Sequence, residues 1–176
     1  MLIKDFQLIQ LHRQKQYNIS KKEKNHIEHL LYKKLQHILT NKQVGSFCFC
    51  HMYDDDFQVW PTIDDLIKKQ KIVYISEIKN NKLIFNKIED IYNKFNYLDG
   101  YLKYSDKKYT EEIDIFIFPV QIYKNKEGVV FNDVITSFLQ EYNGIKLAYS
   151  LKDNYVDDLE NIDKKIIINF DEIIEL

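Results

Sequence analysis

The hydrophobic positions of this chain follow two different spacings. From residue 20 to residue 40, apolar side chains recur every three to four positions, which is the spacing of one face of an α-helix. Ser20 stands at the start of this stretch and Glu23 follows three positions later, a capping-box pattern that predicts where the helix begins. Residues 3–17 contain no helix-breaking residue and predict an earlier helix.

Short apolar runs separate the helical stretches and predict buried strands. They are SFCFCHMY (46–53), KIVYISEI (71–78), IDIFIFPV (113–120, ended by Pro119), IKLAYS (145–150) and a last strand KKIIINF (164–170). Helices are expected at 61–70 and 132–142, and the acidic stretch NYVDDLE predicts another at 154–160. Short extended segments are expected at 81–88 and 97–105. Strands that alternate with helices predict a mostly parallel sheet covered on both faces, a three-layer α/β/α sandwich.

Length and charge narrow the class of protein. At 176 residues the chain is long enough for one domain with a real core. Its net charge of −2 comes from interspersed charges, whereas nucleic-acid and membrane surfaces need a concentrated basic face. No apolar run approaches the roughly 18 residues that span a bilayer, and the N-terminus lacks a secretory h-region. We therefore expect a cytoplasmic protein with reduced cysteines and no nucleic-acid or membrane partner.

The cysteines and histidines favour structural interpretations. Cys48 and Cys50 are two positions apart in a predicted strand, so their side chains point to one face. Their spacing is not that of a zinc or thioredoxin-like site, and no second pair exists, which favours buried structural cysteines. His26, His29 and His37 share one predicted helix without the glutamate spacing of a zinc protease, and we expect them to face solvent.

An acidic turn, Asp54 to Asp56, follows the first apolar strand and precedes a helix. Ligands of open α/β proteins sit at the carboxyl ends of such strands, where a carboxylate could bind Mg²⁺ or a substrate amine. The same residues could instead form a turn and cap the helix. Trp60, the single tryptophan, could stack on a planar ligand or pack as a half-exposed prop.

The stretch 125–150 is predicted to run from loop to helix to strand. A loop that holds phosphate at this place needs glycines so that backbone N–H groups can close on the anion. This loop has only Gly128, followed by Phe131, Asn132 and Asp133. The chain has a single arginine, so a polyanion site would rest on lysines or backbone. The alternative is that Asn132 or Asp133 caps its own helix, with Gly144 as the C′ residue after it.

Taken in order, the segments resemble the 5-formyltetrahydrofolate cyclo-ligase (methenyltetrahydrofolate synthetase) family over nearly the whole chain. NISKKEKNHIEHLLYKKL is similar to that family's Leu-Ser-x-Glu helix, and DGYLKYSD to its Gly-Ile-x-Glu-Pro segment. DIFIFPVQIYKNKEG is similar to its strand Asp-Leu-x-x-x-Pro-Gly-Val with the following loop. FLQEYNGIKLAYS is similar to its helix end and the strand Ile-Gly-Leu-Ala-Tyr.

The resemblance implies one cyclo-ligase-like domain over residues 1–176. It also implies Mg-ATP as cofactor and the ATP-dependent conversion of 5-formyltetrahydrofolate to 5,10-methenyltetrahydrofolate, a step of one-carbon metabolism. The family's turn glutamate matches Asp56, so the candidate folate or metal contacts are Asp56, Tyr53 and Trp60. The candidate phosphate-loop positions are Lys124, Lys126, Gly128, Phe131, Asn132, Asp133 and Lys152. No residue is assigned as a catalytic group or as a firm metal ligand.

The family's glycine-rich signature, roughly Gly-Tyr-Gly-x-Gly-Tyr-Tyr-Asp-Arg, is replaced here by VVFNDVITS. Phe131, Asn132 and Asp133 fall where the glycines would be, and an aspartate adds like charge beside phosphate. The sequence therefore predicts a diverged member that is weak or inactive in the ATP-dependent reaction, a possible pseudoenzyme. The alternative is an active cyclo-ligase with a lysine-based phosphate site. We expect a folate-type small molecule as partner, and a monomer or weak dimer.

Overall fold

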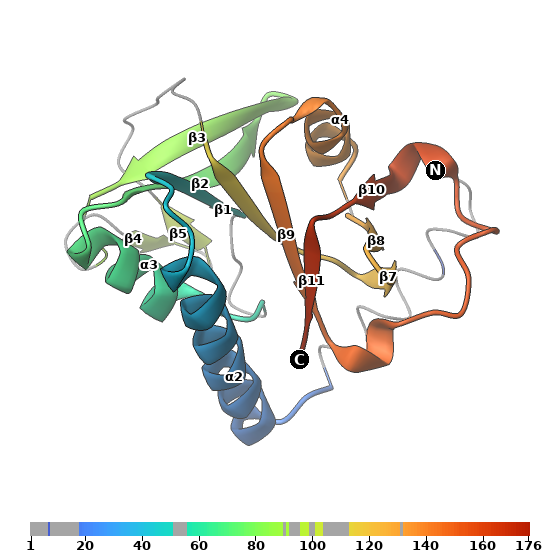
Figure 1. The fold of residues 1–176 in the computed structure, drawn as a ribbon, viewed down its shortest axis with the longest axis horizontal. Helices are drawn as coiled ribbons and strands as arrows, with labels where there is room; N and C mark the ends of the chain where they lie inside the picture. The colour runs from blue at the N-terminus through green and yellow to red at the C-terminus, as the bar shows by residue number, and fades with distance from the viewer. Residues whose placement is uncertain are drawn as a thin grey trace.

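The computed structural model describes residues 7, 18–50, 56–89, 91, 96–98, 101–103, 113–130 and 132–176. A six-stranded sheet runs through its centre in the order β11-β9-β6-β1-β2-β3 (Figure 1). In chain order the strands are β1 (Ser46–Cys50), β2 (Ile72–Lys79), β3 (Lys82–Ile88), β6 (Ile115–Pro119), β9 (Ile145–Ser150) and β11 (Glu172–Glu175). The helix predicted over 3–17 lies outside the described residues apart from Gln7, which is helical.

The sheet is parallel except at one edge. The pairs β11–β9, β9–β6, β6–β1 and β1–β2 are parallel, and β3 alone runs antiparallel beside β2. Asn80 and Asn81 join β2 to β3 with φ of 53° and 57°, the left-handed backbone that asparagine tolerates in two-residue hairpin turns. The predicted mostly parallel sheet is confirmed, with β6 in its interior.

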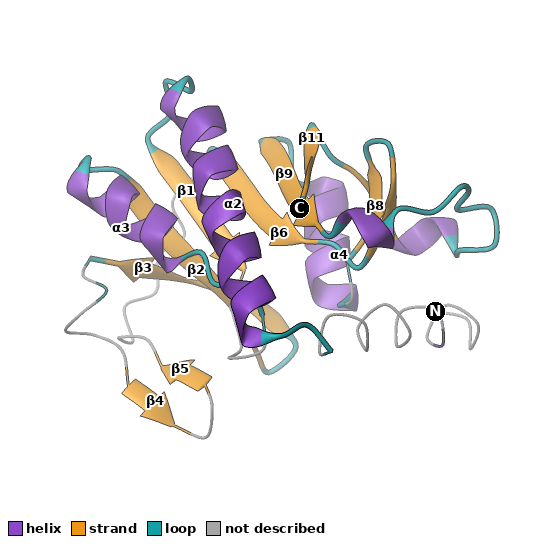
Figure 2. Ribbon diagram, turned by 90° about the horizontal axis from the view of Figure 1, so that it is seen from below, coloured by secondary structure: helices purple, strands orange, loops and turns teal. Residues whose placement is uncertain are grey.

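Helices cover both faces of this sheet. Helices α2 (Lys21–Thr40) and α3 (Trp60–Lys68) lie on one face, and α4 (Asp133–Glu141) lies on the other (Figure 2). Alternate residues of each strand feed two separate cores, because side chains alternate across a strand. Phe47 and Phe49 pack under α2 and α3, whereas Cys48 packs under α4. The predicted three-layer sandwich is confirmed.

The core under α4 is built from aromatic rings around Phe116. The centroid of the Phe116 ring lies 5.6 Å from Phe85, 5.1 Å from Phe118, 5.0 Å from Phe138 and 5.1 Å from Tyr142. These rings come from β3, β6, α4 and the residue that follows α4. Phe116 therefore joins the sheet to the helix that covers it.

The cysteine and histidine interpretations are confirmed for the residues described. Cys48 is buried, Cys50 is half-buried against the same core, and both are free thiols. Burial raises the pKa of the Cys48 thiol well above its usual value, which makes it unreactive. His26, His29 and His37 are exposed on α2.

One helix predicted near the C-terminus is wrong. The stretch 154–160 is not an α-helix: a short 3₁₀ helix, η1 (Lys152–Asn154), leads into irregular chain. Asn154, the last residue of η1, is buried and donates from Nδ2 to Ser150 Oγ at 3.1 Å, while Leu159 packs on a small separate sheet. Asparagine and aspartate favour such local bonds over continuing a helix.

The strand predicted over 164–170 is confirmed over part of its length and belongs to a smaller sheet. Its residues form a 3₁₀ turn, η2 (Lys164–Ile166), and then strand β10 (Ile167–Asn169). Strand β10 pairs with β8 (Glu127–Val129), which also pairs with β7 (Ile122–Lys124), in a three-stranded sheet of its own. The main sheet is closed by β11, which was not predicted. A separate two-stranded ribbon, β4 (Asn96–Leu98) with β5 (Tyr101–Lys103), falls in the region predicted as extended.

The helix boundaries agree with the capping signals at the N-termini. Ser20 Oγ accepts from the Glu23 N–H at 3.3 Å, and Glu23 Oε2 accepts from the Ser20 N–H at 3.0 Å, so the capping box of α2 is formed. Pro61 lies in the first turn of α3, as predicted. The prediction of Gly144 as the C′ residue of α4 is wrong, because Tyr142 is the C-cap and Gly144 lies two positions further on. No helix among the described residues is long and apolar enough to cross a membrane.

At the amino edge of the sheet, one carboxylate joins the starts of two neighbouring strands. Asp114 Oδ2 accepts from the N–H of Gly45 at 2.9 Å and of Ser46 at 3.0 Å. These hydrogen bonds lower the pKa of the Asp114 carboxyl, and the bond from Gly45 has the largest effect. The charged form of Asp114 therefore stabilises the junction of β1 and β6.

We expect Asp114 to make stability pH-dependent in acid. Because its pKa is lower in the folded chain, its contribution is present above the ordinary aspartate pKa of about 3.9 and is lost as pH falls through the folded value. Urea unfolding at a series of pH values should show a smaller acid loss for Asp114→Asn than for the parent chain. Equal acid losses in the two proteins would contradict this assignment.

Candidate functional site

The carboxyl edge of the parallel sheet is where ligands bind in folds of this type. Strands β1, β6 and β9 end there at Cys50, Pro119 and Ser150. The predicted site residues fall into two groups beside this edge. One group follows β1 and includes Asp56 and Trp60, and the other follows β6 and β9.

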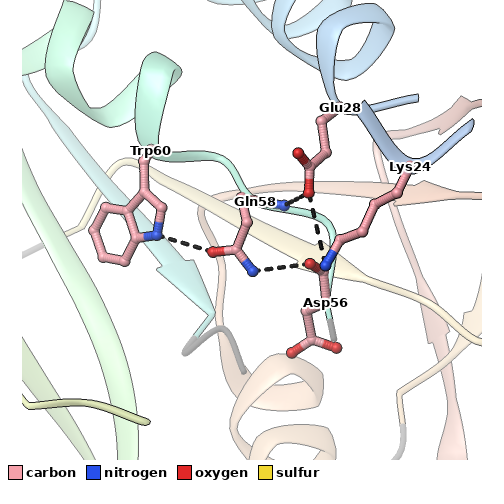
Figure 3. A network of polar contacts seen from close by, with 5 residues as sticks. All are labelled: Lys24, Glu28, Asp56, Gln58 and Trp60. Carbon is pink, nitrogen blue, oxygen red and sulfur yellow. Dashed lines mark hydrogen bonds and ion pairs between the residues drawn. The ribbon is translucent and has the colours of Figure 1, made fainter. Parts of the chain in front are cut away.

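A chain of polar contacts holds the segment after β1 against α2 (Figure 3). The indole Nε1 of Trp60 donates to Gln58 Oε1 at 2.9 Å, and Gln58 Nε2 donates to the backbone carbonyl of Asp56 at 2.8 Å. The Gln58 N–H donates to Glu28 Oε1 at 3.0 Å, and the Lys24 ammonium lies 3.9 Å from the same oxygen. Trp60 is thereby fixed in a half-buried position at the start of α3.

The phenol of Tyr149 on β9 is buried and lies within electrostatic reach of the Asp56 and Glu28 carboxylates. Burial is the largest cause of the raised pKa of Tyr149. Electrostatic interactions with Cys50, Asp56 and Glu28 raise this pKa further. Asp56 takes part in the contact chain through its backbone, while its carboxylate points away from Gln58 (Figure 3). Gln58 lies between the indole of Trp60 and the two acids Glu28 and Asp56 (Figure 3). A ligand that binds this group would offer N–H donors, because carboxylates only accept hydrogen bonds.

The predicted phosphate loop is largely a β-hairpin. Lys124 ends β7, Asn125 makes the turn with a φ of 54°, and Gly128 lies within β8. A Cβ on Gly128 would lie 3.1 Å from both Phe170 and Val120, so close packing explains the glycine at this position. Gly128 is thus part of a paired strand between β7 and β10.

The start of α4 is capped by its own chain. Asn132 Oδ1 accepts from the N–H of Val134 at 2.9 Å and of Ile135 at 3.2 Å. Asp133, exposed, is the first residue of the helix and adds a negative charge there. The prediction that Asn132 or Asp133 caps this helix is confirmed, with Asn132 as the N-cap; Phe131 lies outside the described residues.

The structure brings the lysine-bearing segments near one another. Val156 N–H donates to the Tyr123 carbonyl at 2.9 Å, and Tyr123 forms a bridge with Tyr155. Lys124 therefore neighbours the segment that begins at Lys152, and Lys126 is exposed at the hairpin turn. No group of three or more possible metal-ligating side chains occurs in the described parts of the chain, and Tyr53 lies outside them.

Sequence reasoning did not select Glu28, Gln58 or Tyr149 as site residues. Glu28 lies in a predicted amphipathic helix, where nothing in the local sequence marks it as a site residue. Tyr149 belongs to a predicted buried strand. The only local signal was the position of Gln58 between Asp56 and Trp60. Their meeting depends on the packing of α2 over the end of β1, which no local pattern encodes.

Replacement of the α4 cap should be measurable as a loss of stability. We expect Asn132→Ala to lower the free energy of unfolding by about 1 kcal/mol, because two helix N–H groups lose their acceptor. Asn132→Asp keeps the acceptor and should stay within a few tenths of a kcal/mol of the parent. Urea unfolding compares the two variants, and an equal loss in both would argue against the cap.

These features define a three-layer α/β protein with a candidate ligand site at the carboxyl edge of its sheet. The fold is that of the 5,10-methenyltetrahydrofolate synthetases. The solved structure of the Aquifex aeolicus synthetase matches with a TM-score of 0.77 and 13% identity, over 96% of this chain and 88% of that one. The synthetase from Mycoplasma pneumoniae matches with a TM-score of 0.76 and 18% identity, over 98% of both chains. At these identities the similarity shows the fold. No protein-family model matches the sequence. No curated protein matches it either.

Proposed function

We propose that the protein is a diverged member of the 5-formyltetrahydrofolate cyclo-ligase family. In this proposal it binds a folate-type ligand and is weak or inactive in the ATP-dependent conversion of 5-formyltetrahydrofolate to 5,10-methenyltetrahydrofolate. The observation that carries the proposal is the cap of α4, where Asn132 already occupies two helix N–H groups.

The residues at the start of α4 do not fit a triphosphate. A helix N-terminus binds phosphate through N–H groups that the helix itself leaves without partners. Here the Asn132 side chain accepts from two of these groups, and the carboxylate of Asp133 lies beside them. Like charge next to phosphate opposes binding, and the single arginine, Arg13, is the only guanidinium for the whole chain. These features argue against Mg-ATP as a cofactor at this helix.

The group around Trp60 supports retention of a folate-type ligand. A pterin ring is planar and carries amino and ring N–H donors, which match an indole face and carboxylate acceptors. Glu28 and Asp56 supply the acceptors, and Gln58 holds Trp60 in place. None of these contacts depends on a phosphate site.

A second candidate is an active cyclo-ligase whose phosphate site is made of lysines. The observation in its favour is the neighbouring placement of Lys124 and the segment of Lys152, with Lys126 exposed at the hairpin turn. Lysine binds phosphate as a point charge and does not need a glycine-rich backbone. This candidate predicts binding of Mg-ATP.

Turnover and binding separate the two candidates. Purified protein is mixed with 5-formyltetrahydrofolate and Mg-ATP, and the methenyl chromophore is followed beside an active synthetase. The proposal expects no chromophore and no rise in melting temperature with Mg-ATP. A chromophore that requires ATP and scales with protein would establish the alternative, and Lys124→Gln and Lys152→Gln would then be expected to reduce it.

Folate binding is read from the intrinsic fluorescence of Trp60, the single tryptophan, after correction for ligand absorbance. We expect saturable quenching by 5-formyltetrahydrofolate. Glu28→Gln keeps an oxygen for the Gln58 N–H and removes the charge, so affinity should fall about tenfold. His29→Gln, on the exposed side of the same helix, is the matched control and should bind like the parent. The folate part of the proposal fails if no saturable quenching occurs.

A further inference from the structure

The link between α4 and β9 contains the single asparagine–glycine pair of the sequence, Asn143 and Gly144. Asn143 is exposed and follows Tyr142, the C-cap of α4, and Gly144 immediately precedes β9. Every other asparagine in the sequence is followed by a residue that carries a side chain. Asn143 therefore differs chemically from every other asparagine position of the chain.

The polar groups of this pair are not held by hydrogen bonds. Within the described residues, neither the side-chain amide of Asn143 nor the backbone N–H of Gly144 has a partner. The residues on either side are held. The Tyr142 N–H donates into the last turn of α4 at 2.9 Å, and the Ile145 N–H donates to the Asp114 carbonyl at 3.1 Å. The untied groups are therefore confined to the two residues of the pair.

Packing fixes the glycine of this pair. A Cβ at position 144 would collide with the hydroxyl and ring of Tyr142. That ring is itself held, because its hydroxyl donates to the Ile113 carbonyl and its centroid lies 5.1 Å from that of Phe116. Glycine has no Cβ to crowd an atom that approaches its own nitrogen. The residue that the packing requires at position 144 is thus the one that leaves the backbone nitrogen most open to the preceding side chain.

We propose that Asn143 is a site of spontaneous deamidation and that its isoaspartyl product destabilises the aromatic core under α4. The Gly144 nitrogen gives its proton to solvent and attacks Asn143 Cγ. The new N–Cγ bond forms, the Cγ–Nδ2 bond breaks, and ammonia leaves with that electron pair and a proton from water. Water then opens the resulting succinimide at either carbonyl, which gives aspartate or isoaspartate. The net change converts an amide and water into a carboxylic acid and ammonia, and it does not depend on the proposed folate site.

The two products differ in what they do to the main chain. Isoaspartate lengthens the main chain by one atom, because the chain then runs through the former side-chain carbons. The extra atom falls between two anchored residues: Tyr142, whose ring stacks on Phe138, and Ile145, which pairs with Ile115 in the main sheet. Either Tyr142 leaves the aromatic cluster or the first pair between β9 and β6 is lost. Aspartate keeps the length of the main chain and adds only a charge at an exposed position.

The reaction is tested by ageing the purified protein in warm, mildly alkaline water enriched in heavy oxygen, followed by peptide mapping with mass spectrometry. Conversion during ageing introduces a heavy oxygen atom, which separates it from conversion during digestion. We expect Asn143 to convert at least about ten times faster than Asn125, an exposed turn asparagine followed by Lys126. Asn143→Gln keeps an exposed amide but must close a larger ring, so it should not convert. A rate at Asn143 no faster than that at Asn125 would overturn the proposal.

The consequence is tested by thermal unfolding of the aged protein, with isoaspartate measured by enzymatic methylation of its carboxylate. We expect a second transition about 4 °C or more below that of the fresh protein, with an amplitude that follows the isoaspartate content. Asn143→Asp, which carries the aspartyl product, should melt within about 2 °C of the parent, and aged Asn143→Gln should show no second transition. Absence of isoaspartate, or a single transition like that of Asn143→Asp when isoaspartate is present, would overturn the proposal.

Discussion

Phe116→Ala is expected to lower the free energy of unfolding by about 3–5 kcal/mol. The Phe116 ring is 0% exposed and packs with four other rings that come from β3, β6, α4 and the residue after α4. Its removal leaves a cavity that these rings cannot fill without moving both the helix and the edge strand. Urea unfolding followed by circular dichroism measures the change.

The control for this prediction is Ile78→Thr. Ile78 lies on β2 and is 36% exposed, and threonine keeps the β-branched side chain that strands favour. We expect a change below about 1 kcal/mol. If Phe116→Ala cost no more than this control, the aromatic cluster would not be the link between sheet and helix.

Gly144→Ala is expected to destabilise the protein by about 1–3 kcal/mol, although it adds a single methyl group. The new Cβ would collide with the hydroxyl and ring of Tyr142. That ring packs against Phe116 and Phe138, and its hydroxyl donates to the Ile113 carbonyl. Tyr142 would have to leave these contacts to make room. Thermal and urea unfolding both report the loss.

A double-mutant cycle isolates this clash. In a Tyr142→Ala background the obstacle is gone, so Gly144→Ala should add little further loss, and the two changes should be strongly non-additive. Gly45→Ala is the matched control, because its Cβ would meet nothing closer than 3.8 Å, and its cost should be under about 1 kcal/mol. Additive losses at 142 and 144 would show that the glycine is required for another reason.

The group of Glu28, Gln58 and Trp60 and a separate pocket between α2 and α3 share no lining residue. The group of Glu28, Gln58 and Trp60 lies where α2 and α3 begin, beside the carboxyl end of β1. The pocket is lined by residues from Tyr32 onward in α2 and from Thr62 onward in α3.

The architecture could be predicted because its signals are local. Alternation of short apolar runs with helical spacing indicated a mostly parallel sheet with two helical layers. The helix caps at Ser20 and Asn132 could be predicted from the sequence, because each depends on residues within three positions. Long-range pairing could not be predicted, so nothing in the sequence placed the strand at 164–170 in a separate sheet, and β11 was missed.

The candidate site was predicted only in part, for the same reason. Asp56 and Trp60 were found because they follow an apolar strand, but Glu28 comes from a different helix and reaches them through Gln58. The hairpin of Lys124 and Gly128 was expected to be an open loop, because nothing local showed that β10 would pair with it. The candidate contact Tyr53 and the loop residue Phe131 remain predictions.

By itself, the sequence determined the class of fold, the starts of α2 and α4, and the absence of a glycine-rich phosphate loop, because each depends on neighbouring residues and backbone preference. The tertiary structure decided which acid contacts the Trp60 segment through Gln58, which glycines are required by packing, and where a pocket forms between α2 and α3. These depend on contacts between segments distant in the chain, which arise only when the helices and strands pack together.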